Sequence, residues 1–215
     1  YDYIVVGAGP TGSMVATELA RKGFSTLLID AGKDYMHPNI TVPAFQFNTL
    51  ETEQIQWDYW VKHYDESTGL RQQVLYPKAS GLGGCTLHNS LIHVYPNSRD
   101  FKEMVELTGD KSWAETTFRK YLETIALYRL VRPGAQVTSD ADLEDYIRKT
   151  SWGHHATGTM KIGKDDDPNA VLDGNFKVRG VENLRVIDLS VMPNLPGYFP
   201  VMFLYLLGMK GADAI

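Results

Sequence analysis

The pattern of apolar and polar positions predicts a strand, a helix and a second strand at the start of the chain. Residues 3–6 form an apolar run that is too short for a helix and contains β-branched residues. Apolar residues then recur at helical spacing over residues 14–20, and Lys22-Gly23 ends the helix. Residues 26–29 form a second strand, and we expect both strands to be buried. The pattern therefore indicates one βαβ unit of an α/β fold.

The rest of the chain gives a more varied pattern. Residues 34–75 lack a sustained period, although they are rich in aromatic residues, and we interpret them as a long excursion. Residues 99–127 are expected to be helical, and a short helix is expected over about 140–148, capped by Ser139. Residues 171–193 predict two short strands around a turn. The segment from Pro200 onward predicts a buried helix.

The turn after the first strand contains a G-x-G-x-x-G motif at residues 7–12. In this context the first glycine permits a tight turn, the second lets a pyrophosphate approach, and the third brings helix and strand together. The phosphates would meet the N–H groups at the helix N-terminus. Asp30 ends the second strand, where an acidic residue accepts hydrogen bonds from ribose hydroxyls. The expected dinucleotide-binding residues are Gly7, Gly9, Pro10, Thr11, Gly12 and Asp30.

This unit alone does not distinguish FAD from NAD, and a glycine turn without a ligand is the alternative. The composition narrows the class of protein further. The chain has 215 residues, a formal charge of −5 and one cysteine, Cys85. Its mild acidity argues against a nucleic-acid partner, and no stretch reaches the roughly 20 apolar residues of a membrane helix. Asn39-Ile40-Thr41 is a glycosylation sequon, which favours an extracellular location only slightly and leaves the compartment unassigned.

Three ordered blocks of the sequence resemble the glucose–methanol–choline (GMC) family of FAD oxidoreductases. The first block is the βαβ unit, which ends in "LLIDAG". The second, "ASGLGGCTLHNSLIHVYPNSRDF", occupies residues 79–101, and the third, "WGHHATGTMKIG…NLPG", occupies residues 152–197. The resemblance implies an α/β fold, namely an FAD/NAD(P)-binding Rossmann-like three-layer (ββα) domain, with FAD as the cofactor. No metal is assigned.

The resemblance also implies which residues hold the FAD. The adenosine would lie at the glycine motif and Asp30, and the second block would approach the pyrophosphate and the flavin from the other side. Residues of the third block would lie by the phosphates and the flavin ring. The cofactor-binding residues that the resemblance adds are Gly83, Gly84, His88, Asn89, Asp188, Pro200 and Val201.

His88 has a further implied role. In family members whose signature reads G-G-C-x-x-H-N, this histidine is joined covalently to the flavin 8α-methyl group. A neutral imidazole is a competent nucleophile near pH 7. The alternative is an unmodified, hydrogen-bonded histidine beside the cofactor.

His155 is the expected catalytic residue, because it precedes Gly158-Thr159 at the spacing of the family's H-x-x-G-T histidine. The resemblance implies that it takes the alcohol proton as a general base while the flavin N5 takes the hydride. The family's second polar residue falls on Phe199, which makes no conventional hydrogen bond. Either Tyr198 substitutes, or the alignment slips by one, or the reaction is not ordinary alcohol oxidation. The candidate catalytic residues are His155, Tyr198 and Phe199.

The implied function is oxidation of a CH–OH group of a small alcohol or sugar, with O₂ or another electron acceptor reoxidising the flavin. Two alternatives stay open. One is a lyase of the same fold, similar to hydroxynitrile lyases, with a non-redox flavin, and the other is a non-catalytic remnant. An NAD enzyme would leave the second and third blocks unexplained. Ser80 also departs from the family's first signature, which more often has a basic residue there.

The domain organisation follows from the spacing of the blocks. Family members carry a substrate-binding domain between the first and third blocks. No residues that resemble this domain occur between those blocks here. We therefore interpret residues 1–215 as a single discontinuous FAD-binding domain, with an N-terminal part of about 1–125 and a C-terminal part of about 132–215. The junction falls between about Glu123 and Pro133. Without the missing domain, this polypeptide is expected to oxidise alcohols poorly or not at all, although its full-length parent would do so.

Overall fold

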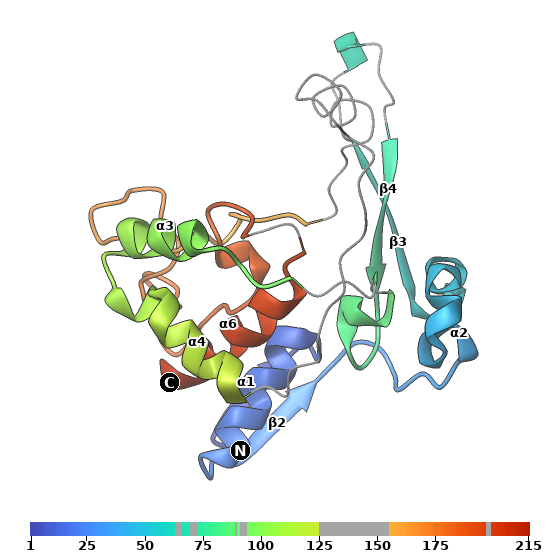
Figure 1. The fold of residues 1–215 in the computed structure, drawn as a ribbon, viewed down its shortest axis with the longest axis horizontal. Helices are drawn as coiled ribbons and strands as arrows, with labels where there is room; N and C mark the ends of the chain where they lie inside the picture. The colour runs from blue at the N-terminus through green and yellow to red at the C-terminus, as the bar shows by residue number, and fades with distance from the viewer. Residues whose placement is uncertain (63–65, 69–72, 89, 91–93, 125–154, 197–198) are drawn as a thin grey trace.

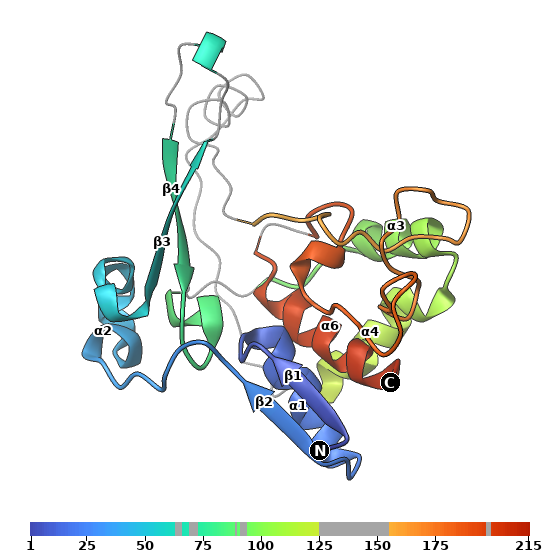
Figure 2. The same cartoon turned by 180° about the vertical axis from the view of Figure 1, so that it is seen from behind.

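The computed structural model describes residues 1–62, 66–68, 73–88, 90, 94–124, 155–196 and 199–215 (Figure 1). A helical body contains both chain ends, and a β-hairpin stands beside it (Figures 1 and 2). The strands are β1 (Tyr3–Val6), β2 (Thr26–Ile29), β3 (Gln56–Lys62) and β4 (Gln73–Ala79). The α-helices are α1 (Pro10–Arg21), α2 (Pro38–Thr41), α3 (Ser98–Thr108), α4 (Glu115–Thr124) and α6 (Val201–Asp213).

The predicted βαβ unit is confirmed, and both strands have the predicted boundaries, whereas the helix begins earlier than its apolar spacing indicated. Strands β1 and β2 pair in parallel, and α1 connects them. Side chains alternate across a strand, so one face of the pair meets α1. Ile4 and Val6 point to the other face and are 62% and 81% exposed. The expectation of two buried strands is therefore wrong for the described residues, because a helix covers only one face of a two-stranded sheet.

Residues 34–75 were expected to be irregular, and that expectation is wrong in its second half. Strands β3 and β4 form an antiparallel hairpin with Gln56 opposite Ala79 and Lys62 opposite Gln73. Aromatic side chains occupy both faces of β3, with Trp57 and Tyr59 on one face and Trp60 on the other. This arrangement hides the apolar–polar alternation by which a half-buried strand is recognised.

The helical region predicted for residues 99–127 is confirmed as far as Thr124, but it is divided. A capping box between Asn97 and Asp100 starts α3. Gly109, with φ of +69°, ends the helix in the left-handed conformation. The core between α3, α4 and α6 contains stacked rings, such as Phe118 and Phe203 with centroids 5.9 Å apart.

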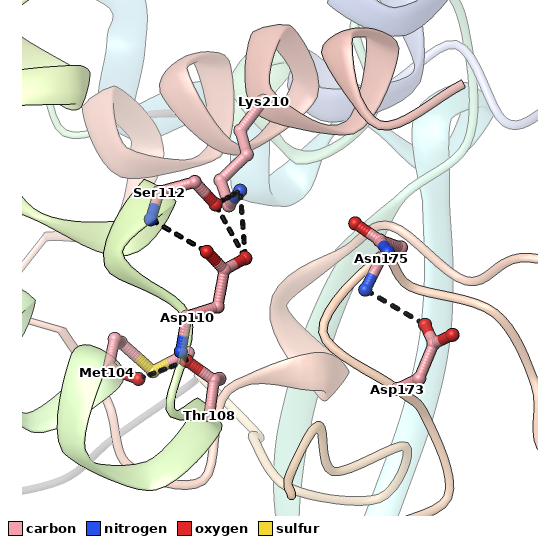
Figure 3. A network of polar contacts seen from close by, with 7 residues as sticks. All are labelled: Met104, Thr108, Asp110, Ser112, Asp173, Asn175 and Lys210. Atoms are coloured by element: carbon pink, nitrogen blue, oxygen red, sulfur yellow. Dashed lines mark hydrogen bonds and ion pairs between the residues drawn. The ribbon is translucent and has the colours of Figure 1, made fainter.

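The two strands predicted within residues 171–193 are not formed. Isolated bridges join Leu172 to Ile162 and to Val178 instead. The Asp173 carboxylate accepts a hydrogen bond from the backbone N–H of Asn175 (Figure 3). It also accepts one from the backbone N–H of Lys177, which closes a turn where a strand was expected. The helix expected over 140–148 lies outside the described residues. The helix predicted from Pro200 is confirmed as α6.

A buried lysine ties α6 to the segment after α3 (Figure 3). The ammonium group of Lys210 donates to Ser112 Oγ at 2.6 Å and lies 4.0 Å from Asp110 Oδ2. It also lies 4.9 Å from the ring centroid of Trp113. Burial lowers the pKa of Lys210, although the charge of Asp110 opposes this. We assign this group a packing role, because its contacts join α6 to the segment after α3.

Helix α6 packs along α1 and so joins the two ends of the chain (Figure 2). Gly208 makes this possible, because a Cβ at that position would lie 2.6 Å from the Thr11 carbonyl oxygen and 2.7 Å from Met14 Cβ. Lys22 of the α1 C-cap donates to the Ala212 carbonyl oxygen at the other end of the interface. Within the described part of the chain, no helix has the length and apolarity needed to cross a membrane.

Gly208→Ala is expected to lower the free energy of unfolding by about 1–3 kcal/mol, since α1 and α6 must separate to admit the methyl group. Gly174→Ala is the matched control, because a Cβ there meets only ordinary contacts at 3.8 and 3.9 Å. That change should stay within about 0.5 kcal/mol. Urea unfolding measures both variants, and equal effects would contradict the proposed closeness of the helices.

Candidate functional site

The glycine turn is built as a phosphate-binding turn. Gly7 has φ of +99°, and a Cβ on Gly12 would lie 2.0 Å from the Gly7 carbonyl oxygen. Gly9 caps α1, whose first turn contains no acidic residue. The Ser13 N–H is bonded to the Gly9 carbonyl oxygen at 2.9 Å, so the N–H groups that precede it belong to the open helix end. Such an end attracts an anion.

Asp30 holds this turn from the end of β2. Its two carboxylate oxygens accept hydrogen bonds from the backbone N–H groups of Ala8, at 2.7 Å, and Gly32, at 2.8 Å. A carboxylate has about four acceptor positions, so acceptor capacity is left for ligand hydroxyls. The ribose contact expected for Asp30 stays a prediction.

The second glycine block lies directly against the first. The Gly83 N–H donates to the Ala8 carbonyl oxygen at 2.9 Å. A Cβ on Gly84 would lie 2.9 Å from the Gly9 Cα, so no larger residue fits there without movement. Residues about 75 positions apart in sequence therefore form one surface, as the resemblance implied. Asn89 lies outside the described residues.

His88 ends the 3-10 turn η4 (Gly84–His88) that follows these glycines. Its Nε2 is buried and has no hydrogen-bond partner among the residues that the structure describes. Buried polar atoms are nearly always paired, so an acceptor or a ligand atom at this nitrogen fits the arrangement. The covalent link implied for His88 stays a prediction.

The third block contacts the β4 strand near His155. The N–H of Ala156, next to His155, donates to the Tyr76 hydroxyl oxygen at 3.0 Å. Burial, and then the positive charge of Lys78, hold the pKa of His155 below its ordinary value. The ring is therefore neutral at pH 7, the form that a general base requires.

Sequence reasoning missed Lys78 and Tyr76. One signal was available in the sequence. The family's first signature more often has a basic residue at the position of Ser80, and Lys78 supplies a positive charge two positions earlier. Its positive charge lowers the pKa of both His155 and Cys85, so both side chains lie within electrostatic range of Lys78.

Lys78→Met is expected to raise the pKa of His155, because the nearby positive charge that disfavours protonation is removed. A larger fraction of the ring is then protonated near pH 6 to 7, and less is available as a base. Lys78→Arg keeps the charge and is the matched control. The proton NMR titration of the His155 ring measures both, and identical titrations for Met and Arg would contradict the assignment.

The remaining predicted residues lie around α6. Asp188 caps a short turn by accepting from the Ser190 N–H at 2.8 Å, and the neighbouring Ile187 packs on Gly211 of α6. Pro200 is the buried residue before α6, and Val201 begins the helix. Gly208, which packs against Thr11 of the glycine turn, lies about 12 Å along the helix axis from Pro200. Phe199 is at the surface, and Tyr198 lies outside the described residues.

The fold and these contacts describe an α/β protein in which two glycine-rich blocks meet, and in which a histidine of lowered pKa lies near the charge of Lys78 on β4. A family model described as GMC oxidoreductase matches residues 92–208, more than half of the chain. The chain belongs to the GMC oxidoreductase family, whose enzymes are FAD-dependent flavoproteins. A second model, described as Lycopene cyclase protein, matches residues 2–77, less than half of the chain, and includes the βαβ unit.

Individual relatives agree with this family. Mitochondrial choline dehydrogenase of Mus musculus is 34% identical over 112 residues, covering 51% of this chain and 17% of that protein. Choline oxidase of Arthrobacter globiformis is 33% identical, covering 56% and 22%. The structure of pyridoxine 4-oxidase from Mesorbium loti matches 58% of this chain and 24% of its own, with a TM-score of 0.52 and 26% identity. The matched part spans less than a quarter of each relative.

Proposed function

We propose that this chain is the FAD-binding part of an oxidoreductase that acts on a CH–OH group of a small molecule. The observation that carries the proposal is the Gly83–Ala8 hydrogen bond, which joins two glycine-rich blocks into one surface. The names of relatives support the substrate class, since choline and pyridoxine both carry primary alcohols.

The residues present fit the cofactor. The open end of α1 and the glycines at positions 7, 9 and 12 would hold the pyrophosphate, and Asp30 would accept from the ribose hydroxyls. Gly84 lets the second glycine block pack closely against Gly9 of the first. The Nε2 of His88, which has no hydrogen-bond partner among the described residues, would offer a contact for the flavin. When bound, FAD would supply the two-electron acceptor that no side chain provides.

His155 would accept the hydroxyl proton of the substrate. Its lowered pKa keeps the ring neutral at pH 7, so the proton has an acceptor there. Tyr76 would keep this segment in place through its bond to Ala156. The positive charge of Lys78 would stabilise the negative charge that develops on the substrate oxygen. Tyr198 and Phe199 remain candidates for the substrate side of the site.

The two parts of the chain, about 1–125 and about 132–215, would form one discontinuous FAD-binding domain of the Rossmann-like three-layer type. The packing of α6 on α1 through Gly208 supports this arrangement, because it joins the two parts beside the glycine turn. The exposed apolar face of β1 supports a further layer on that side. A substrate-binding domain would lie between the two parts in larger relatives.

Anaerobic absorbance spectroscopy tests the proposed function. The chain is reconstituted with FAD, and choline, pyridoxine or a simple primary alcohol is added without oxygen. We expect slow loss of the visible flavin absorbance, with dithionite reduction as the control for a responsive flavin. Cleavage of an added cyanohydrin with unchanged absorbance would indicate the lyase alternative, and absorbance unchanged with every alcohol would contradict oxidation by this chain.

A further inference from the structure

The hairpin formed by β3 and β4 leaves the long edge of β3 open. It stands beside the helical body, and within the described residues it is a two-stranded sheet in which β3 pairs with β4 alone (Figures 1 and 2). Every residue of β3 after Gln56 is exposed, and Trp60 is 63% exposed. An exposed edge strand of this length is a template for pairing with another strand.

The hydrogen-bonding phase of the hairpin shows which backbone groups lie on this edge. The Ser80 N–H donates to the Ile55 carbonyl oxygen at 2.7 Å at the start of the ladder. Hydrogen-bonded and non-hydrogen-bonded pairs alternate along an antiparallel ladder. The odd-numbered residues of β3 therefore bond to β4, whereas Asp58, Trp60 and Lys62 turn their N–H and C=O groups to the outer edge.

The outer edge of β4 cannot continue the sheet in the same way. Pro77 lies opposite Asp58, at a position where the backbone of β4 also faces outward. Proline has no N–H group, so a donor is missing from the middle of that edge. The β3 edge has a donor and an acceptor at each outward residue, so pairing through β3 is favoured and growth through β4 is blocked.

The charges of β3 select one occupant and one register. When two β3 strands pair antiparallel about a two-fold axis, outward-facing residues lie opposite outward-facing residues. With the axis at Trp60, Asp58 of each copy lies opposite Lys62 of the other, so both pairs are complementary. An axis at Tyr59 would place Asp58 opposite Trp60, and an axis at Asp58 would place two carboxylates together. The exposed Lys62–Glu66 ion pair, at 2.8 Å, is weak enough to be exchanged.

We propose that β3 is a dimerisation strand, which pairs with β3 of a second copy of this chain to form a four-stranded antiparallel sheet. Trp60 then lies opposite itself on one face of that sheet. On the other face Tyr59, whose ring centroid lies 5.9 Å from that of Trp57, meets Val61 of the second copy. The apolar surface of β3 becomes continuous across the two copies, and its partial burial favours association.

Sedimentation velocity of the 215-residue chain over a range of concentrations tests the assembly. We expect a reversible monomer–dimer equilibrium at micromolar concentrations. Asp58→Lys and Lys62→Asp should each weaken dimerisation about tenfold or more, because each places like charges opposite one another twice. The double variant restores complementary pairs and should recover the wild-type dissociation constant. Circular dichroism checks that each variant is folded.

Disulfide cross-linking tests the register independently. In the Cys85→Ser background, which has no other cysteine, Trp60→Cys places a thiol opposite its own copy. The Cα separation there is about 5.5 Å, which a disulfide tolerates. Trp57→Cys is the matched control, because the two copies of position 57 would lie about 20 Å apart along the strands. Mild oxidation should give a reducible dimer for Trp60→Cys alone.

A monomer at every concentration overturns the inference, and it would leave the β3 edge to another segment or to a different protein. Assemblies larger than a dimer contradict the blocked edge of β4. Loss of dimerisation that the double charge variant does not rescue, or equal cross-linking of the Trp57→Cys and Trp60→Cys proteins, contradicts pairing about Trp60.

Discussion

Gly12→Ala is expected to destabilise the start of the fold by about 3 kcal/mol or more, a large part of the stability of an ordinary domain. The added Cβ would lie 2.0 Å from the carbonyl oxygen of Gly7 and 3.2 Å from its carbonyl carbon. Both atoms belong to the backbone, so no side-chain rotation relieves the overlap, and α1 must move off β1. Urea unfolding followed by circular dichroism measures the loss.

Gly9→Ala provides the matched comparison in the same turn. A Cβ on Gly9 meets no atom within 4 Å, and the residue has φ of −70°, which alanine adopts readily. We expect the free energy of unfolding to change by less than about 1 kcal/mol. The methyl group would occupy the space through which the pyrophosphate approaches, so FAD affinity should fall about tenfold or more. Unchanged FAD affinity in a folded Gly9→Ala protein would contradict the phosphate assignment.

His155→Gln is expected to slow alcohol-driven loss of flavin absorbance by about 10²–10⁴-fold, the usual contribution of a positioned general base. Glutamine is close in size and keeps hydrogen-bonding capacity, but it does not accept a proton at neutral pH. The binding of FAD should change little, because the contacts assigned to the phosphates involve other segments.

Anaerobic stopped-flow absorbance of the FAD-loaded variant and wild type makes this comparison. Reduction by dithionite is the control, since it needs no protein base and should proceed equally in both proteins. In the wild type, alcohol-driven reduction should also decline as pH falls through the pKa of His155, because protonation removes the base. Equal rates in wild type and His155→Gln would rule out the role proposed for this residue.

Sequence reasoning was most successful where the structure depends on local interactions. The two strands of the βαβ unit were predicted to the residue, and the helix between them was predicted in type and end, because each is specified by neighbouring positions. The α6 helix from Pro200 was predicted for the same reason. The prediction of two strands within residues 171–193 was wrong, since Asp173 closes a turn there through hydrogen bonds from backbone N–H groups.

The parts of the site that depend on distant contacts were less accessible. The family motifs implied that the two glycine blocks converge, but the bond from Gly83 to Ala8 follows only from the fold. Lys78 was missed because it lies on a hairpin whose aromatic residues obscured the strand pattern. The requirement for glycine at position 208 could not be predicted either, because it arises from the close approach of the Thr11 backbone on another helix.

The central claim is that segments from both ends of the chain meet one FAD molecule. The direct measurement is a titration of nitrogen-15-labelled protein with FAD, following the backbone amide signals of Gly9, Gly84 and Ala156. We predict that all three signals shift together and give the same dissociation constant. Saturable shifts confined to Gly9 and its neighbours, or no saturable shift at any of the three, would contradict the account.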